Sequence, residues 1–465
     1  MADVPSPYAG LSLWHDQAFG MGDAFAPRPS LPGSLDADVA IVGAGYTGLW
    51  TAYALLERDP SMRVVVVERE IAGFGASGRN GGWASAIFPT PWKRIARDSS
   101  RDAARRMQLA LNESVDVIGA TAEREGFDCH FSKGGYLSVA RNQAQWVRGQ
   151  SEVAHAREWG FGEDFLRLLN AAEVADRIGI SNALGGTYTP HCAAIQPQLL
   201  NRGLAEAVER KGASIFERTP ATAVGPRLVR TPHGDVRAEV VVRATEGYTA
   251  DLQGSERDVV PMYSLMVATE PLPDDVLASI GLEDRATFSD KRHLRIYGQR
   301  TADGRIAFGG RGAPYHFGSR VDPSFDHDQH VHDMLRTIVR ELFPVLADAR
   351  FTHAWGGNLG IPRDWFPSVG LDRRSGFAWA GGYVGDGVTT ACLAGRTLAD
   401  LITRTPSDLV TLPWVGRRSR RWEPEPLRWI GVNAVTKLMA HGDRSEASTG
   451  KPSQAVQTFW KTLGF

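Results

Sequence analysis

A glycine-rich turn near the N-terminus constrains the fold of this chain more than any other feature. The turn reads Gly43-x-Gly45-x-x-Gly48, follows a short apolar run and leads into a helical pattern of apolar residues. A second apolar run, 64–67, ends in Glu68, which lies 20 residues after Gly48. This order of strand, turn, helix, strand and acid is the complete fingerprint of a βαβ unit that binds a dinucleotide.

Each residue of the turn has a physical role in this interpretation. Gly43 permits the tight turn, Gly45 lets the backbone approach a pyrophosphate, and Gly48 lets the helix pack closely on the strand. The helix then begins near Tyr46 and Thr47, where its first N–H groups and the positive end of its dipole face the phosphates.

The acid at the end of the second strand indicates the kind of dinucleotide. We expect Glu68 to accept hydrogen bonds from a ribose. Its negative charge disfavours a 2′-phosphate at the same place, although the cationic Arg69 follows directly. Both residues are therefore predicted to lie at the cofactor.

Composition excludes several other classes of protein. The chain has 465 residues, of which 43% are hydrophobic, so a large core and two domains are expected. The 52 Lys and Arg residues balance 53 Asp and Glu residues, which argues against a nucleic-acid partner. Three scattered cysteines suggest neither a disulfide framework nor a metal site. With no leader pattern and no apolar run of about 18 residues, we expect a cytoplasmic protein without a membrane span.

The spacing of apolar residues along the rest of the chain predicts an α/β fold, which is α+β when the whole chain is considered. In this fold a Rossmann-like sheet is accompanied by a second, more antiparallel sheet. Helical spacing is expected over 96–126 with an interruption near Asp98, and over 142–159, 197–211 and 324–343. Strands are expected at 135–140, 214–216, 228–231, 240–243, 263–269, 294–297 and 305–308.

Two further glycine-rich segments, 75–82 and 381–387, lie far from the first in sequence. One such segment can hold a pyrophosphate, whereas three favour an extended cofactor with a second ring system that needs backbone N–H donors. Their candidate cofactor-binding residues are Gly75, Ala76, Ser77, Arg79, Asn80, Gly81 and Gly82 in the first, and Gly382, Tyr383, Val384, Gly385, Asp386 and Gly387 in the second. The dipole of the helix after Gly387 would stabilise negative charge on a reduced ring.

The C-terminal segment 413–465 carries four arginines, Arg417, Arg418, Arg420 and Arg421, beside three tryptophans. Basic residues among aromatic ones can indicate nucleic acid. Because the run is short and the chain is neutral, we expect instead that this tail packs on the body or at an interface between copies.

The glycine-rich segments, together with Pro261-Met-Tyr-Ser-Leu-Met266, Phe308-Gly-Gly310 and Trp355-Gly-Gly357, make the sequence resemble the FAD-dependent oxidoreductases of the D-amino-acid oxidase superfamily. The resemblance spans about 36–405. It is greatest to the branch of glycine, sarcosine and gamma-glutamylputrescine oxidases, and Gly-Arg-Asn-Gly-Gly at 78–82 and Trp-Gly-Gly at 355–357 favour the gamma-glutamylputrescine oxidase-like members.

The resemblance implies a split FAD-binding domain interleaved with an antiparallel-sheet substrate domain. The division that we expect has a lead-in at 1–35, FAD-binding parts at 36–90, 171–255 and 351–405, substrate parts at 91–170 and 256–350, and the tail at 406–465.

The resemblance also implies FAD as the cofactor, and two departures from the family pattern matter. Many relatives carry Ser-Gly-His-Gly in the last glycine turn, where this chain has Val384-Gly-Asp-Gly387. Sarcosine oxidases hold FAD through a cysteine before that turn, but 351–370 contains none, so we expect non-covalent FAD.

The reaction that the resemblance implies is removal of hydride from a carbon bearing an amine, giving an imine that water hydrolyses. An aromatic pocket would disfavour the cation and deliver the amine uncharged. The candidate catalytic residues are Trp355, His316, Tyr263 and Arg311. Arg311, among small neighbours, is the candidate to bind a substrate carboxylate through two parallel hydrogen bonds, with Arg292 and Arg295 as alternatives. Other candidate wall residues are Tyr297, Tyr315, His353 and Trp365.

Three interpretations stay open at this point. The chain is either an amine or amino-acid oxidase or dehydrogenase, or an FAD enzyme for a non-amine substrate such as a hydroxylase or 2-hydroxyacid dehydrogenase. A flavoprotein subunit of a larger dehydrogenase is a third possibility. The expected partners are a small amine or amino acid and either O2 or an electron carrier to reoxidise the flavin.

Overall fold

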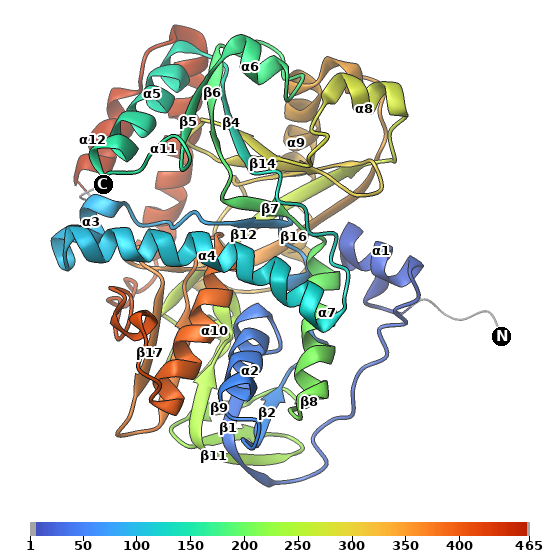
Figure 1. The fold of residues 1–465 in the computed structure, drawn as a ribbon, viewed down its shortest axis with the longest axis vertical. Coiled ribbons are helices and arrows are strands. Elements are labelled where there is room, and N and C mark those ends of the chain that lie inside the picture. Colours follow the sequence, from blue (N-terminus) through green and yellow to red (C-terminus); the bar gives the residue numbers. More distant parts are fainter. Residues whose placement is uncertain (1–5, 463–465) are drawn as a thin grey trace.

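The computed structural model describes residues 6–462 and is built around two large β-sheets (Figure 1). The first lies in the lower half of the view and the second in the upper half, with the long helix α4 (Arg101–Glu125) between them. This arrangement confirms the predicted fold class.

The first sheet has the parallel centre of a dinucleotide-binding domain. Its strand β1 pairs in parallel with both β2 and β11, β2 pairs in parallel with β8, and β11 pairs in parallel with β18. The order is β17-β18-β11-β1-β2-β8, and β9 and β10 continue from β11. The strands are β1 (Leu35–Val42), β2 (Val64–Val67), β8 (Ser214–Phe216), β9 (Ala223–Gly225), β10 (Leu228–Thr231), β11 (Gly234–Arg243), β17 (Ser368–Asp372) and β18 (Phe377–Gly381).

Both faces of the central strands are buried, which explains why they read as continuous apolar runs. Val64 and Val66 point into the core that contains the helices α2 (Tyr46–Arg58) and α10 (Gly387–Thr403). Val65 and Val67 point into a second cluster formed with the β9–β11 meander.

The second sheet is antiparallel except where β4 runs parallel to β13. Its order is β16-β12-β15-β14-β13-β4-β6-β5, and the amphipathic helix α9 (Gln329–Leu342) buries its apolar face against it. The strands are β4 (Tyr136–Ala140), β5 (Arg167–Asn170), β6 (Gly185–Thr189), β12 (Val259–Thr269), β13 (Thr287–Asp290), β14 (Ile296–Arg300), β15 (Ile306–Gly310) and β16 (Phe351–Pro362). A small separate pair is formed by β3 (Trp83–Ser85) and β7 (Cys192–Ala194).

The remaining helices cover these sheets or link them. They are α1 (Leu13–Gly20), α3 (Trp92–Asp98), α5 (Gln143–Glu158), α6 (Ala171–Ala175), α7 (Pro197–Arg210), α8 (Asp274–Ile280), α11 (Leu427–Thr449) and α12 (Gln454–Thr462). Within residues 6–462, none of the helices combines the length and the low polarity that are needed to cross a bilayer. The tail helices α11 and α12 lie beside α5 at one side of the second sheet (Figure 1).

Several elements lie outside the domain segments expected for them. The strands β6 and β16 fall within 171–255 and 351–405, which we expected in the FAD-binding domain, but both belong to the second sheet because they complete its hydrogen-bond ladder. Helix α4 falls within 91–170, expected in the substrate domain, but its apolar face packs on α10 and α7 of the first.

Candidate active site

The first glycine turn, between β1 and α2, is built so that only glycine fits. Gly43 has a φ of 108°, a left-handed conformation that favours glycine. A Cβ on Gly48 would lie 1.9 Å from the carbonyl oxygen of Gly43, and one on Gly45 would lie 2.8 Å from the Ser77 hydroxyl. The turn therefore presents backbone atoms without side chains to the cavity beside it.

A cavity of about 310 Å³ adjoins this turn, and we call it the cofactor cavity. Its wall includes these predicted cofactor residues: Gly43, Gly45, Tyr46, Thr47, Glu68, Arg69, Gly75, Ala76, Ser77, Asn80, Tyr383, Gly385 and Gly387. Four others, Gly48, Gly82, Gly382 and Val384, line neither this cavity nor the larger one next to it. Arg79, Gly81 and Asp386 line the larger one.

Glu68 lies at this cavity and also fastens the turn. Its carboxylate accepts hydrogen bonds from the N–H groups of Ala44, at 2.8 Å, and Glu70, at 3.0 Å. Burial raises the pKa of Glu68, and these two hydrogen bonds oppose that rise. Each carboxylate oxygen has a second lone pair, so the group keeps the capacity to accept from a ribose. The guanidinium of Arg69 lies over the ring of Tyr248.

The second glycine-rich segment is braced from several sides. Arg79 is buried, with its guanidinium 2.5 Å from the carboxylate of Asp326 and 3.2 Å from the hydroxyl of Tyr248. The Asn80 side chain donates to the carbonyl oxygens of Ala76 and Ser77, at 3.2 and 2.8 Å. Both polar side chains thus hold the loop in shape.

The third glycine-rich segment is held by a carboxylate that the sequence did not single out. Glu246 accepts hydrogen bonds from the N–H groups of Gly382, at 2.8 Å, and Tyr383, at 3.1 Å. Burial raises the pKa of Glu246 to about 7, although these donors oppose the rise. Glu246 follows β11 in the loop that also lines the cofactor cavity, so no local motif marks it.

A larger cavity, of about 490 Å³, continues from the cofactor cavity, and we call it the substrate cavity. The residues that line both are Ala76, Asn80, Leu359, Gly385 and Val388. The substrate cavity thus begins where the second and third glycine-rich segments meet β16.

Charged and aromatic side chains divide the wall of the substrate cavity. Two ion pairs, Arg292 with Asp290 at 2.6 Å and Lys291 with Glu152, belong to one part of it. The aromatic side chains in the wall are Trp83, Phe88, Trp92, Tyr136, His155, Phe165, His191 and Tyr297.

Near the glycine-rich segments the wall carries charges with few partners. Arg311 donates one hydrogen bond, to the carbonyl oxygen of Val384, and its guanidinium lies 6.0 Å from the Trp365 ring. Arg295 makes no side-chain hydrogen bond or ion pair with residues 6–462. The carboxylate of Asp386 likewise has neither within that range. We call these three residues the charged end of the substrate cavity.

The structure does not bring the other three candidate catalytic residues to either cavity. Trp355 packs edge-on against Trp14 and donates its indole N–H to the carbonyl oxygen of Arg79, at 2.9 Å. His316 stacks on Phe325, and Tyr263 lies edge-on to both of these rings. Trp355 and Tyr263 are buried, and His316 is half-buried against Phe325.

Of the other candidate wall residues, Tyr297 alone lines the substrate cavity, and its hydroxyl lies 2.7 Å from the Ser264 hydroxyl. Tyr315 donates its hydroxyl to the tail residue Glu425, and His353 lies 3.2 Å from Asp16. Trp365 stands behind Arg311 without lining the cavity.

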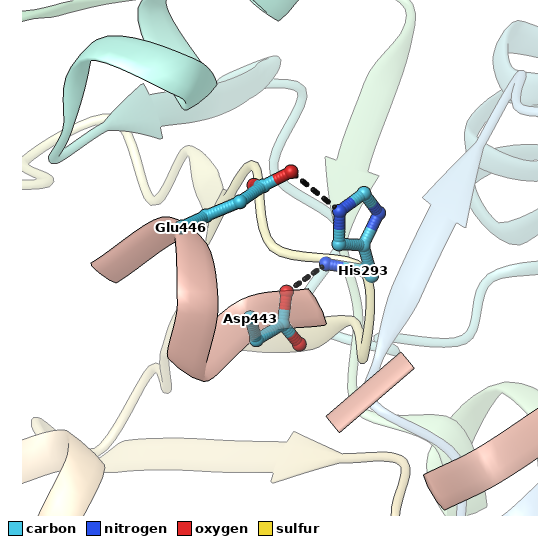
Figure 2. Close-up of side chains that lie close together, drawn as sticks. All are labelled: His293, Asp443 and Glu446. Atoms are coloured by element: carbon cyan, nitrogen blue, oxygen red, sulfur yellow. Dashed lines mark hydrogen bonds and ion pairs between the residues drawn. The ribbon is translucent and has the colours of Figure 1, made fainter. Parts of the chain in front are cut away.

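A histidine and two carboxylates, His293, Asp443 and Glu446, lie close enough together to suggest a metal centre (Figure 2). Each group already has protein partners. Asp443 accepts from the N–H groups of His293 and Leu294, and Glu446 lies 2.8 Å from both the His293 ring and Arg148. The cluster therefore fastens α11 to the loop before β14 and offers no free ligand set.

Comparison with known proteins identifies a family and several similar proteins. Residues 38–401 match the family model described as DAO, FAD dependent oxidoreductase. The gamma-glutamylputrescine oxidoreductase of Escherichia coli (strain K12) is 31% identical over 384 residues, which are 81% of this chain and 86% of that protein. The probable oxidoreductase OrdL of Rhizobium meliloti (strain 1021) is 31% identical over 417 residues, 87% of this chain and 91% of the relative.

Among solved structures, glycine oxidase from Geobacillus kaustophilus superimposes with a TM-score of 0.68 at 22% identity, over 83% of this chain and 99% of that one. At that level of identity the likeness concerns the fold: a parallel Rossmann-like sheet and a separate, mostly antiparallel sheet.

Proposed function

We propose that this chain, which belongs to the DAO family of FAD-dependent oxidoreductases, oxidises the C–N bond of an amine or amino acid that carries a carboxylate. The observation that carries this proposal is Arg311, whose guanidinium lines the substrate cavity next to the cofactor cavity. Among residues 6–462 its only hydrogen-bond partner is the carbonyl oxygen of Val384.

The residues of the cofactor cavity fit FAD. The glycine turn and the start of α2 offer a bare backbone and a helix N-terminus to a pyrophosphate. Asn358 is buried in the same wall, and both polar atoms of its amide lack a partner among residues 6–462. A buried amide left without hydrogen bonds is costly, so we assign Asn358 to the cofactor along with Glu68.

FAD, when bound, supplies the acceptor for the hydride that leaves the carbon beside the amine. The chain has to hold that carbon in one orientation. Arg311 does so by binding the carboxylate, since a guanidinium pairs with a carboxylate through two parallel hydrogen bonds. Burial lowers the pKa of Arg311, and the charge of Asp386 opposes that effect. A desolvated cation of this kind gains most from an anionic substrate group.

The size of the cavity supports a substrate larger than the smallest amino acids. The wall of the cavity carries aromatic side chains and the two ion pairs besides the charged end, around a space of about 490 Å³. We therefore expect an extended molecule with its carboxylate and reacting amine at the charged end. The relatives named for gamma-glutamylputrescine and glycine are consistent with amine chemistry on this fold.

Anaerobic bleaching of the flavin tests this function directly. The holoenzyme is mixed with simple amines, polyamines, N-methyl amino acids, D-amino acids and 2-hydroxyacids. We expect carboxylated amines to bleach the flavin and to release ammonia or amine in equal amount. Bleaching by 2-hydroxyacids alone, without release of amine, would instead support the non-amine alternative. Bleaching by simple amines alone would remove the role given to Arg311.

A further inference from the structure

Within the part of the chain that the structure describes, the Asp386 carboxylate makes no hydrogen bond. It stands between the third glycine-rich turn and α10, at the N-cap position, yet its side chain makes no capping hydrogen bond. It also makes no ion pair within residues 6–462. A carboxylate taken partly out of water costs free energy unless something pairs with it. A purely structural role for the Asp386 carboxylate would therefore be unusual.

The position of Asp386 suggests what completes it. Its neighbours Gly385 and Val388 line both cavities, Gly387 lines the cofactor cavity, and Asp386 itself lines the substrate cavity. Asp386 therefore stands where the two cavities meet, which is where the reacting part of a substrate must lie.

The charges around Asp386 come from two other segments of the second sheet. Arg295 precedes β14 and Arg311 follows β15, and the carbonyl oxygen of Arg295 accepts the N–H of Arg311 at 3.0 Å. Among residues 6–462, Arg295 and Arg311 thus lie near Asp386, and none of the three side chains makes an ion pair. This is the pattern that a zwitterion complements.

We propose that the charged end of the substrate cavity binds the zwitterionic head of an amino acid, with Arg311 and Arg295 on the carboxylate and Asp386 as the base that takes a proton from the ammonium group. This inference rests on the proposed function and names its substrate class and a further catalytic residue. In the step, one N–H bond of the ammonium breaks, its electron pair stays on nitrogen, and the proton bonds to a carboxylate oxygen of Asp386. No oxidant or other reactant is needed.

Among the titratable groups at this end of the cavity, Asp386 is the one suited to exchange a proton with the substrate. Burial raises the pKa of Asp386, and the charges of Arg295 and Arg311 oppose that rise. Burial raises the pKa of Tyr297, and that of Cys192 to about 12, so both remain protonated at neutral pH. Transfer from ammonium to carboxylate replaces two charges with two neutral groups, which a site partly shielded from water favours.

Glu246 is the other carboxyl group whose chemistry would suit a base, because burial raises its pKa to about 7. However, it accepts hydrogen bonds from Gly382 and Tyr383 and lines only the cofactor cavity. It therefore holds the glycine turn and does not face the substrate.

The pH dependence of flavin reduction tests the assignment. The holoenzymes of the wild type and Asp386→Asn are reduced anaerobically by an amino acid that bleaches the wild type, from pH 6 to 10. Without the base, the ammonium must lose its proton to solvent. We expect reduction of the variant to be slower by about 100-fold at pH 7, within the usual range for general base catalysis, and to recover toward wild type near pH 10. Glu270→Gln, which removes a carboxylate paired with Arg350 outside both cavities, should retain the wild-type profile.

A binding experiment gives a readout without turnover. Glycine betaine and 3,3-dimethylbutyrate have the same shape and one carboxylate each, but only the first carries a cation. Perturbation of the flavin spectrum reports the Kd of each. We expect Asp386→Asn to raise the Kd of glycine betaine by about 10-fold relative to the Kd of 3,3-dimethylbutyrate. Flavin content verifies folding, and Asp386→Ser serves the same two measurements if the Asn variant does not fold.

Three outcomes would overturn the inference. An unchanged pH profile together with an unchanged Kd ratio would exclude Asp386 as the base and leave the proposed function standing. A loss of equal size at every pH would show that Asp386 is structural. If no carboxylated amine bleaches the wild type, the proposed function fails and the zwitterion site fails with it.

Discussion

The hydroxyl of Thr47 lies 2.9 Å from the hydroxyl of Tyr383, in a buried hydrogen bond between residues 336 positions apart. Thr47 belongs to the first glycine turn and Tyr383 to the third. The Ser77 hydroxyl makes a similar connection, since it accepts the N–H of Tyr46 at 2.9 Å and so joins the second segment to the first. Three segments that are remote in sequence are thereby held as one cofactor site.

Removal of the Tyr383 hydroxyl should loosen this site. Tyr383→Phe leaves the buried Thr47 hydroxyl without its partner, at a cost of about 1–3 kcal/mol. We expect a lower unfolding temperature and faster loss of FAD, measured by thermal melting and by flavin release into a desalting column. Tyr53→Phe is a matched control, because Tyr53 lies on α2 and its hydroxyl pairs with Glu125 away from both cavities. Equal FAD loss in both variants would contradict a specific role for the Thr47–Tyr383 bond.

Glu68→Ala should weaken the retention of FAD. The substitution removes hydrogen bonds to a charged group, each worth about 1.5–3 kcal/mol, and frees the N–H of Ala44 in the glycine turn. The measurement is the Kd of FAD for the apoprotein by fluorescence quenching. Glu70→Ala is the control, since its carboxylate reaches Tyr8 instead. Unchanged affinity in Glu68→Ala would show that Glu68 does not contact the ribose.

The local parts of the fold were predictable from the sequence because their signals are local. The βαβ unit needs only the spacing from Gly43 to Glu68, and Pro197 and Gly212 set the ends of the helix that the structure has at Pro197–Arg210. The break expected near Asp98 separates α3 from α4. The helix expected at 324–343 begins only at Gln329, because Pro323–Asp326 forms a 3-10 turn first.

The candidate site was less predictable because its walls come from distant segments. Tyr263 and Ser264 show the difficulty: successive residues of β12 point to opposite faces, and the serine, not the tyrosine, lines the substrate cavity. Nothing in the sequence fixes which face is which. Asn358 and Glu246 belong to no motif, and only the folded chain shows that they line the cofactor cavity.

The FAD is expected to be released by acid. No cysteine lies in 351–370, and the three cysteines of the chain are all buried. We expect precipitation with trichloroacetic acid to leave a yellow supernatant and a colourless pellet. Colour that stays in the pellet would mean a covalent link.

The attachment of the tail should depend on pH. Burial alone would raise the pKa of Glu446, but hydrogen bonds from His293, Ser453 and Arg148 outweigh it and lower the pKa from 4.5 to about 2. A carboxyl with a lowered pKa stabilises the folded protein fully above pH 4.5, and that contribution is lost as the pH falls toward 2. We expect α11 to lose hydrogen-exchange protection over this interval.

Glu446→Gln isolates this effect. The variant should be less stable than the wild type by about 3 kcal/mol at pH 7, measured by urea unfolding, with the difference shrinking below pH 4.5. A difference that stays constant between pH 7 and 3 would show that Glu446 acts through packing and not through its charge.

Arg311→Lys tests the carboxylate-binding role with the charge retained. Lysine lacks the planar pair of donors, so an interaction through two parallel hydrogen bonds is lost. For carboxylated amines we expect kcat/KM to fall by an amount equivalent to about 2–4 kcal/mol of lost transition-state stabilisation. This is the scale for a desolvated charged contact. Simple amines of similar length serve as the control and should be unaffected, because they have no group for Arg311 to bind. Equal losses for both kinds of substrate would show that Arg311 supports the Val384 turn and does not select the substrate.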